Sequence, residues 1–330
     1  MLPESKYEFP KCIYLDQNKW IDLARAHYGL KEGVPFKEAL ESLSSAVAAG
    51  KVLVPMSCIH VMETVGFNNS NGRRRLAKFM VELSDNLFIV PHINIRRSEI
   101  AHAVLKVLGL NPQTSLRAQV LQRGISFAFG VQPMISEVTK NITKQLEAII
   151  SSKEFSVEFL VNGINTSVSR NDRKVSEEIL EILEEIRGRV LSKLTPDMQL
   201  GVEFHELFTK GSPGQEMRQV LKNLNITLDN FMQNFRNHNQ YLSFFQTVST
   251  MDVFVKLKVA MDKEKHRRIH RNDTKDMVFL CVAVPYCNAI ITERFWNHIV
   301  RTTGLANRYE TQVETNLKKL PDLLENLCCF

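Results

Sequence analysis

The chain has 330 residues and carries 42 basic against 36 acidic side chains, which gives a formal net charge of +6. Hydrophobic residues make up 44% and charged residues 24% of the sequence, which excludes a collagen-like, coiled-coil or wholly disordered chain. The length allows one large domain or two smaller ones. The mild basic excess favours an anionic partner such as nucleic acid without requiring one.

Targeting and redox features lead us to expect a soluble, cytoplasmic protein with no membrane partner. The first ten residues lack the basic and apolar regions of a secretory signal. The longest apolar run, 277–291, is broken by Pro285 and Asn288 and falls short of the roughly 20 residues that a membrane span needs. The six cysteines include no CxxC pair, which indicates reduced thiols and no zinc site.

Strand and helix patterns alternate in the first part of the chain. Such alternation predicts a parallel sheet with helices on both faces. The expected elements are a buried strand at 12–16, a helix from Asn18 to Gly29, a helix at 36–49, a strand at 51–55, helices at 58–67 and 73–83, and a third strand at 86–91.

The middle of the chain changes to helical periodicity, for example in the apolar stripe of 175–190. From residue 251 the α/β pattern returns, with a strand at 288–292 and an edge strand at 309–313. We therefore predict a discontinuous α/β domain, 1–94 plus 251–330, interrupted by an all-α insertion, 95–250. The helices of the insertion fit an internal bundle as readily as a homo-oligomer interface.

Acidic residues stand at the ends of several expected elements, namely Asp16, Glu63, Asp273, Asp276 and Glu293. In an open parallel sheet, functional groups gather at the carboxyl ends of the strands. Carboxylates that meet there cannot all stay ionised unless cations neutralise them. Because the ligands are hard oxygens rather than a histidine and cysteine set, the expected cofactor is Mg²⁺ or Mn²⁺.

Four motifs in this order resemble the PIN-like nucleases: YLDQNKW with Asp16, SCIHVMET with Glu63, NDTKDMVFLCVA with Asp276, and IITERFW with Thr292 and Glu293. The resemblance covers about half the chain and leaves the helical middle unexplained. It departs from the family in having Glu293 where Asp is more usual, and in the additional Asp273.

The resemblance implies a metal-dependent endoribonuclease with a PIN-like sheet, in which Asp16, Glu63, Asp276 and Glu293 are catalytic and hold the metal. A toxin-like or defence role is also conceivable from the family. Asp273 could be a further ligand or a helix N-cap.

Each candidate also has a structural reading. Asp16 could simply cap the helix that follows it, and Asn18 is more readily a cap than a ligand. Glu63 lies among apolar residues, where a lone carboxylate is costly, although it could lie on an exposed helix face. Glu293 could be a first-turn charge, and Thr292 could orient a phosphate or a water, or cap the same helix.

Two basic tracts adjoin the acidic motifs and could bind the backbone of nucleic acid or form solvated faces. RNA is favoured over DNA because the resemblance points to ribonucleases. The nucleic-acid candidates are Arg73, Arg74, Arg75, Lys265, Arg267, Arg268 and Arg271, with Thr292.

Two alternatives stay open: a non-catalytic PIN-like scaffold that binds nucleic acid or protein, and a flap-type DNA endonuclease. The sequence contains no GxxxxGK[ST], GxGxxG or GxSxG motif, so nucleotide hydrolysis, dinucleotide chemistry and serine hydrolysis lose support.

Overall fold

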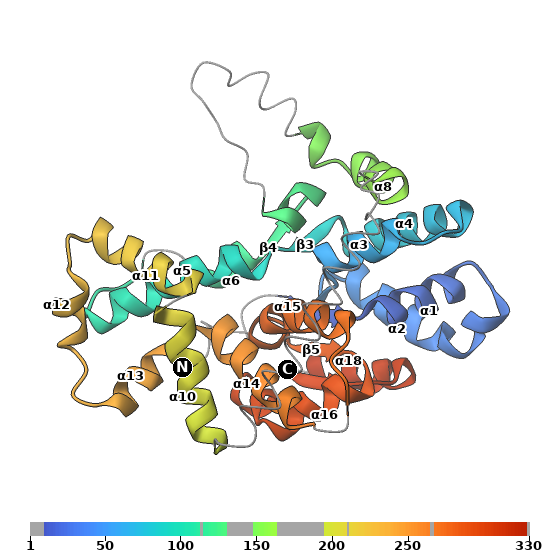
Figure 1. The fold of residues 1–330 in the computed structure, drawn as a ribbon. Coiled ribbons are helices and arrows are strands. Elements are labelled where there is room, and N and C mark those ends of the chain that lie inside the picture. Colours follow the sequence, from blue (N-terminus) through green and yellow to red (C-terminus); the bar gives the residue numbers. More distant parts are fainter. Residues whose placement is uncertain are drawn as a thin grey trace. The chain divides into compact units, whose positions relative to one another are not determined.

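A computed structural model describes residues 10–112, 115–130, 148–163, 195–209, 211–264 and 267–328 (Figure 1). The expected apolar stripe at 175–190 lies outside the described residues. Two compact units emerge from the internal contacts, and each is described by itself. One comprises 2–91, 117–165 and 286–330, and the other 92–116 and 166–285. This division differs from the expected boundaries, because 251–285 belongs with the helical unit and 117–165 with the sheet unit.

The sheet unit is built on four parallel strands in the order β2-β1-β5-β6. The central strand β1 is apolar and buried beyond its first residue, as expected for a strand covered on both faces. The four strands are β1 (Lys11–Leu15), β2 (Val52–Leu53), β5 (Ala289–Ile291) and β6 (Gln312–Glu314). Strands from the two ends of the sequence thus pair directly, which confirms the predicted mixed α/β fold with a small parallel sheet.

Helices surround this sheet (Figure 1). The sheet unit contains α1 (Gln17–His27), η1 (Lys31–Phe36), α2 (Lys37–Ala48), α3 (Cys58–Val65), α4 (Ser70–Ser84), η2 (Ile125–Phe129), α8 (Lys153–Asn162), α16 (Arg294–Thr302), α17 (Leu305–Arg308), η4 (Leu317–Lys319) and α18 (Leu320–Cys328). The core of this unit includes Leu15 of β1, Trp20 of α1, Phe79 of α4 and Leu320 of α18.

Two strand predictions need correction. The segment expected as a third parallel strand, β3 (Leu87–Ile89), pairs antiparallel with β4 (Leu121–Arg123) in a separate two-stranded sheet. The partner strand β4 lies in the region predicted to be all helical. The last strand begins at Gln312 rather than 309, because Glu310 adopts a left-handed backbone (φ 50°) that an extended strand cannot contain.

The close approach of η1 to α1 depends on Gly33. A Cβ at this position would stand 2.1 Å from the backbone nitrogen of Ala26. Since no atom of α1 can move away without breaking the helix, only glycine fits there.

Buried polar contacts also join the central strands. Asn288 accepts from the Cys12 amide through its side-chain oxygen (2.9 Å) and donates its own amide to the Cys12 carbonyl (2.8 Å). The Cys12 and Cys287 sulfurs lie 3.3 Å apart, and both thiols are free.

The helical unit has its own core, in which Phe204, Phe231, Phe244 and Phe245 pack together. Two buried carboxylates tie its helices. Glu216 of α11 pairs with Arg96 of α5 (2.6 Å), and Glu99 of α5 accepts from the Thr250 amide of α14 (3.0 Å). The helices are α5 (His92–Val107), α10 (Pro196–Thr209), α11 (Ser212–Asn223), α12 (Leu228–Met232), α13 (His238–Phe245), α14 (Ser249–Lys263) and α15 (Arg271–Tyr286), while α6 (Leu116–Val120) lies at the boundary of the units.

Across the described parts of both units, no helix is long and apolar enough to cross a membrane.

Candidate active site at the carboxyl edge of the sheet

Asp16 stands where β1 ends and α1 begins. Its amide donates to the Ile291 carbonyl (2.9 Å), which continues the β1–β5 pairing by one residue. Its Oδ1 accepts from the Gln17 amide (2.8 Å), so the carboxylate also serves as the N-cap of α1. The side chain is buried at 9% exposure. The capping role is thus present, and it fixes the carboxylate at the carboxyl edge of the central strand.

Glu63 lies on α3, which a buried histidine fastens to the end of β1. The His60 Nδ1 accepts from the Ser57 amide (2.9 Å), so the ring proton is on Nε2 and is donated to the Leu15 carbonyl (2.8 Å). Burial lowers the pKa of His60 to about 3, which keeps the ring neutral. The ring also stacks on Tyr14, with centroids 5.1 Å apart.

A second contact joins the same two segments. The Gln17 Nε2 donates to the Thr64 hydroxyl (3.1 Å). Leu15 and Gln17, which flank Asp16, are therefore hydrogen-bonded to His60 and Thr64. These two residues lie on either side of Glu63 in the sequence. This double connection brings α3 to the end of β1 and explains why a half-buried glutamate on an apolar helix lies near Asp16.

Glu293 comes from the neighbouring strand. It follows β5 by two residues, occupies the N-cap position of α16 and is exposed. The Asn18 Nδ2 lies 3.4 Å from its Oε1, a long hydrogen bond that links α1 to this carboxylate. Asn18 therefore contacts the site, whereas its sequence position favoured a helix cap.

The three carboxylates affect one another electrostatically. Burial, together with the charges of Glu293 and Glu63, raises the pKa of Asp16 to about 6. The Gln17 amide and the Lys19 ammonium act in the opposite direction. Three segments that are far apart in the sequence thus contribute acidic groups that act on one another, namely Asp16, Glu63 and Glu293.

Carboxylate oxygens are donors of the kind that a hard divalent cation such as Mg²⁺ prefers. Carboxylate oxygens are supplemented by the Thr292 hydroxyl and the Gln17 amide oxygen, both of which are buried and have no hydrogen-bond partner within the described residues. Such orphaned oxygens are costly unless water or an ion satisfies them. Among the described residues, no three Asp, Glu, His or Cys side chains converge closely enough to form a metal site.

Thr292 is completely buried, and its amide donates to the Glu314 carbonyl (2.9 Å). Its place is therefore inside the sheet edge, next to Glu293. Glu314 ends β6 at the same edge, but its carboxylate accepts from the Thr315 amide (2.8 Å) and from Lys319 (3.3 Å). Glu314 lies one residue beyond the expected last strand, 309–313, and was not among the predicted site residues.

Asp273 and Asp276 belong to α15 of the helical unit. Asp273 is buried, accepts from the His270 amide (2.6 Å) and pairs with Arg267 (2.9 Å). Asp273 thus lies in the first turn of α15 rather than at the predicted N-cap position, and its role as a metal ligand stays a prediction. Asp276 is half-buried, and its assembly with the three carboxylates of the sheet unit stays a prediction.

The first basic tract divides its arginines among different partners. Arg73 donates to the Val65 carbonyl (2.7 Å), and Arg74 pairs with Glu158 (2.6 Å). The Arg75 guanidinium lies over the Tyr28 ring, 5.6 Å from its centroid. Within the described part of the chain, Arg74 therefore pairs with an acidic side chain, whereas Arg73 contacts a carbonyl and Arg75 an aromatic ring.

The second tract is only partly described. Arg267 is engaged with Asp273, whereas Arg268 is exposed. Lys265 and the side chain of Arg271 lie outside the described residues. Contact of these residues with nucleic acid stays a prediction.

In comparisons with known proteins, the chain matches no family model, no curated protein and no solved structure.

Proposed function

We propose that the chain is a metal-dependent endoribonuclease that hydrolyses phosphodiester bonds at the carboxyl edge of its parallel sheet. The observation that carries this proposal is the buried Asp16, whose pKa is raised to about 6 by burial and by the charges of Glu293 and Glu63, which come from two other segments of the chain. Raised carboxylate pKa values beside further carboxylates are typical of functional sites. The preference for RNA rests on the resemblance to PIN-like nucleases.

Asp16, Glu63 and Glu293 would hold Mg²⁺ or Mn²⁺, with Asp276 as a further ligand. Such an ion activates a water molecule and offsets charge on the phosphodiester oxygens. The surrounding residues keep the carboxylates in place: His60 and Gln17 fasten α3 to the β1 end, and Asn18 contacts Glu293.

Incubation of the purified chain with end-labelled single-stranded RNA and DNA in Mg²⁺, Mn²⁺ and EDTA tests the proposal. We expect metal-dependent cleavage of RNA that is reduced at least about 100-fold in Asp16→Asn and Glu63→Gln. Glu41→Gln, which changes an exposed carboxylate of α2, should cleave like the wild type. Cleavage that persists in Asp16→Asn, or that is unaffected by EDTA, would contradict the assignment. Asp276→Asn tests the fourth ligand separately.

A further inference from the structure

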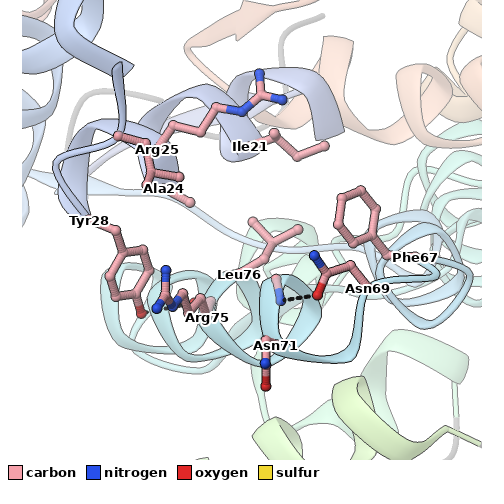
Figure 2. A pocket seen from close by; sticks show the side chains of 11 residues that line it. Ile21, Ala24, Arg25, Tyr28, Phe67, Asn69, Asn71, Arg75 and Leu76 are labelled. Atoms are coloured by element: carbon pink, nitrogen blue, oxygen red, sulfur yellow. Dashed lines mark hydrogen bonds between the residues drawn. The ribbon is translucent and has the colours of Figure 1, made fainter. Parts of the chain in front are cut away.

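A groove between α1 and α4 lies within the sheet unit (Figure 2). It has a volume of about 290 Å³, close to the lower limit for small-ligand sites. Residues of α1 form one wall, the start of α4 forms the other, and Phe67 stands at one end. This size suits one nucleotide rather than an extended surface.

The groove is cationic. Arg25 and Arg75 both line it, and none of its described lining residues is acidic. The Arg25 guanidinium contacts Asp22 at 3.2 Å and is partly exposed, whereas Arg75 packs on the Tyr28 ring. Guanidinium groups of this kind bind phosphate oxygens well, because their donors form a planar fork.

Aromatic and amide groups accompany the arginines. Phe67 and Leu30 line the groove and are 40% and 42% exposed. The Asn69 Oδ1 accepts from the Gly72 amide (3.0 Å), and Figure 2 shows its amide nitrogen turned towards the space between Leu76 and Phe67. An exposed ring with a nearby amide donor can stack a base and contact its edge.

The groove shares a helix with the acidic site. Asp16 caps α1, and Arg25 lies nine residues further along the same helix, which corresponds to about 13 Å at the helical rise per residue. A single strand of nucleic acid can cover this distance with a few nucleotides. A peptide would satisfy the arginines only if it were acidic, and it would make no use of the exposed Phe67 ring beside an amide donor.

We propose that this groove binds an unpaired nucleotide of a single-stranded RNA, with its base against Phe67 and its phosphate on Arg25 and Arg75. The inference rests on the proposed ribonuclease function, since it assigns a substrate subsite to the same active site. It restricts the substrate to strands that are unpaired a few nucleotides from the cleaved bond.

Fluorescence anisotropy with a labelled single-stranded RNA tests this subsite in the Asp16→Asn background, where the full chain would bind without cutting. We expect Arg75→Gln and Phe67→Ala each to weaken binding about ten-fold. Matched controls are Arg308→Gln, an exposed arginine that lies over the Tyr309 ring outside the groove, and Phe129→Ala, another exposed aromatic. Both controls should change binding less than about two-fold.

Equal losses in Arg75→Gln and Arg308→Gln would overturn the subsite in favour of general charge attraction. Competition by poly-glutamate equal to that by unlabelled RNA would overturn it in favour of an acidic peptide. The two proposals fail distinguishably. Cleavage by the wild type with unchanged RNA binding in the groove variants refutes the subsite alone, whereas groove-dependent binding without cleavage refutes the nuclease alone.

Discussion

Replacing Asp16 with Asn should stabilise the protein while abolishing its proposed activity. The Asn side chain keeps an oxygen that can accept from the Gln17 amide, and Asn is as good an N-cap as Asp. It removes the charge that burial, Glu293 and Glu63 all disfavour. The substitution therefore removes the unfavourable charge of the buried carboxylate while keeping the N-cap hydrogen bond.

The size and pH dependence of this effect follow from the pKa of Asp16. A folded-state pKa of about 6 against 3.8 means that the native state binds the proton more tightly. Stability contributed by this group is then complete below pH 3.8 and is lost as the pH rises through about 6. Ionisation of Asp16 lowers the free energy of unfolding by about 3 kcal/mol at pH 8 and by only about 0.5 kcal/mol at pH 4. Asp16→Asn should recover most of this difference at pH 8 and little at pH 4.

Urea denaturation in EDTA, followed by circular dichroism, measures the free energy of unfolding of the wild type and of Asp16→Asn at pH 8 and at pH 4. His60 also titrates abnormally, but its contribution is common to the two proteins and cancels in their difference. Added Mg²⁺ should stabilise the wild type and leave the variant almost unchanged, because a ligand stabilises only the state that binds it. A stability change of equal size at pH 4 and pH 8 would refute the electrostatic argument.

Three further predictions concern the scaffold. His60→Phe keeps a ring but loses both hydrogen bonds, which should lower the free energy of unfolding by roughly 2–4 kcal/mol at neutral pH. Because the folded-state pKa of His60, about 3, lies below the ordinary 6.5, the wild type itself loses stability as the pH falls. A difference between the two proteins in urea denaturation that does not shrink towards pH 4 would contradict this. Arg96→Met should cost about 3–5 kcal/mol in thermal unfolding because it leaves Glu216 buried and unpaired, and Arg96→Met with Glu216→Met should recover most of the loss if the reasoning holds. Gly33→Ala should lower the melting temperature more than Gly50→Ala, where only a left-handed backbone (φ 68°) costs about 1–2 kcal/mol; equal shifts would show that η1 can move away from α1.

The sequence was sufficient for the strands at the centre of the sheet and for the acidic residues that follow them. Apolar runs such as 12–16 bury on both faces whatever surrounds them, so β1 and β5 could be predicted from composition alone. Because parallel strands end at a common edge, the meeting of Asp16 and Glu293 followed from the pattern.

The predictions failed where distant partners decide the structure. The segment 87–89 has the composition of a sheet strand, but its pairing depends on β4, a short stretch with no strand signal of its own. The hydrogen bond from Gln17 to Thr64 and the contact of Asn18 with Glu293 join residues that are far apart in the sequence. Spacing along the chain carries no information about such contacts, so these positioning contacts of Gln17 and Asn18 could not be predicted from the sequence.

The electrostatics of Asp16 differ from those expected of an aspartate that only caps a helix. A helix N-terminus favours a negative charge and on its own lowers the pKa of a capping aspartate. Here burial and two neighbouring glutamates outweigh that effect, and the pKa rises to about 6. Asn or Ser would cap α1 equally well without this cost. Asp16 therefore carries a charge that the helix cap does not need and that a divalent cation would compensate. This arrangement is expected if Asp16 binds a ligand as well as capping its helix.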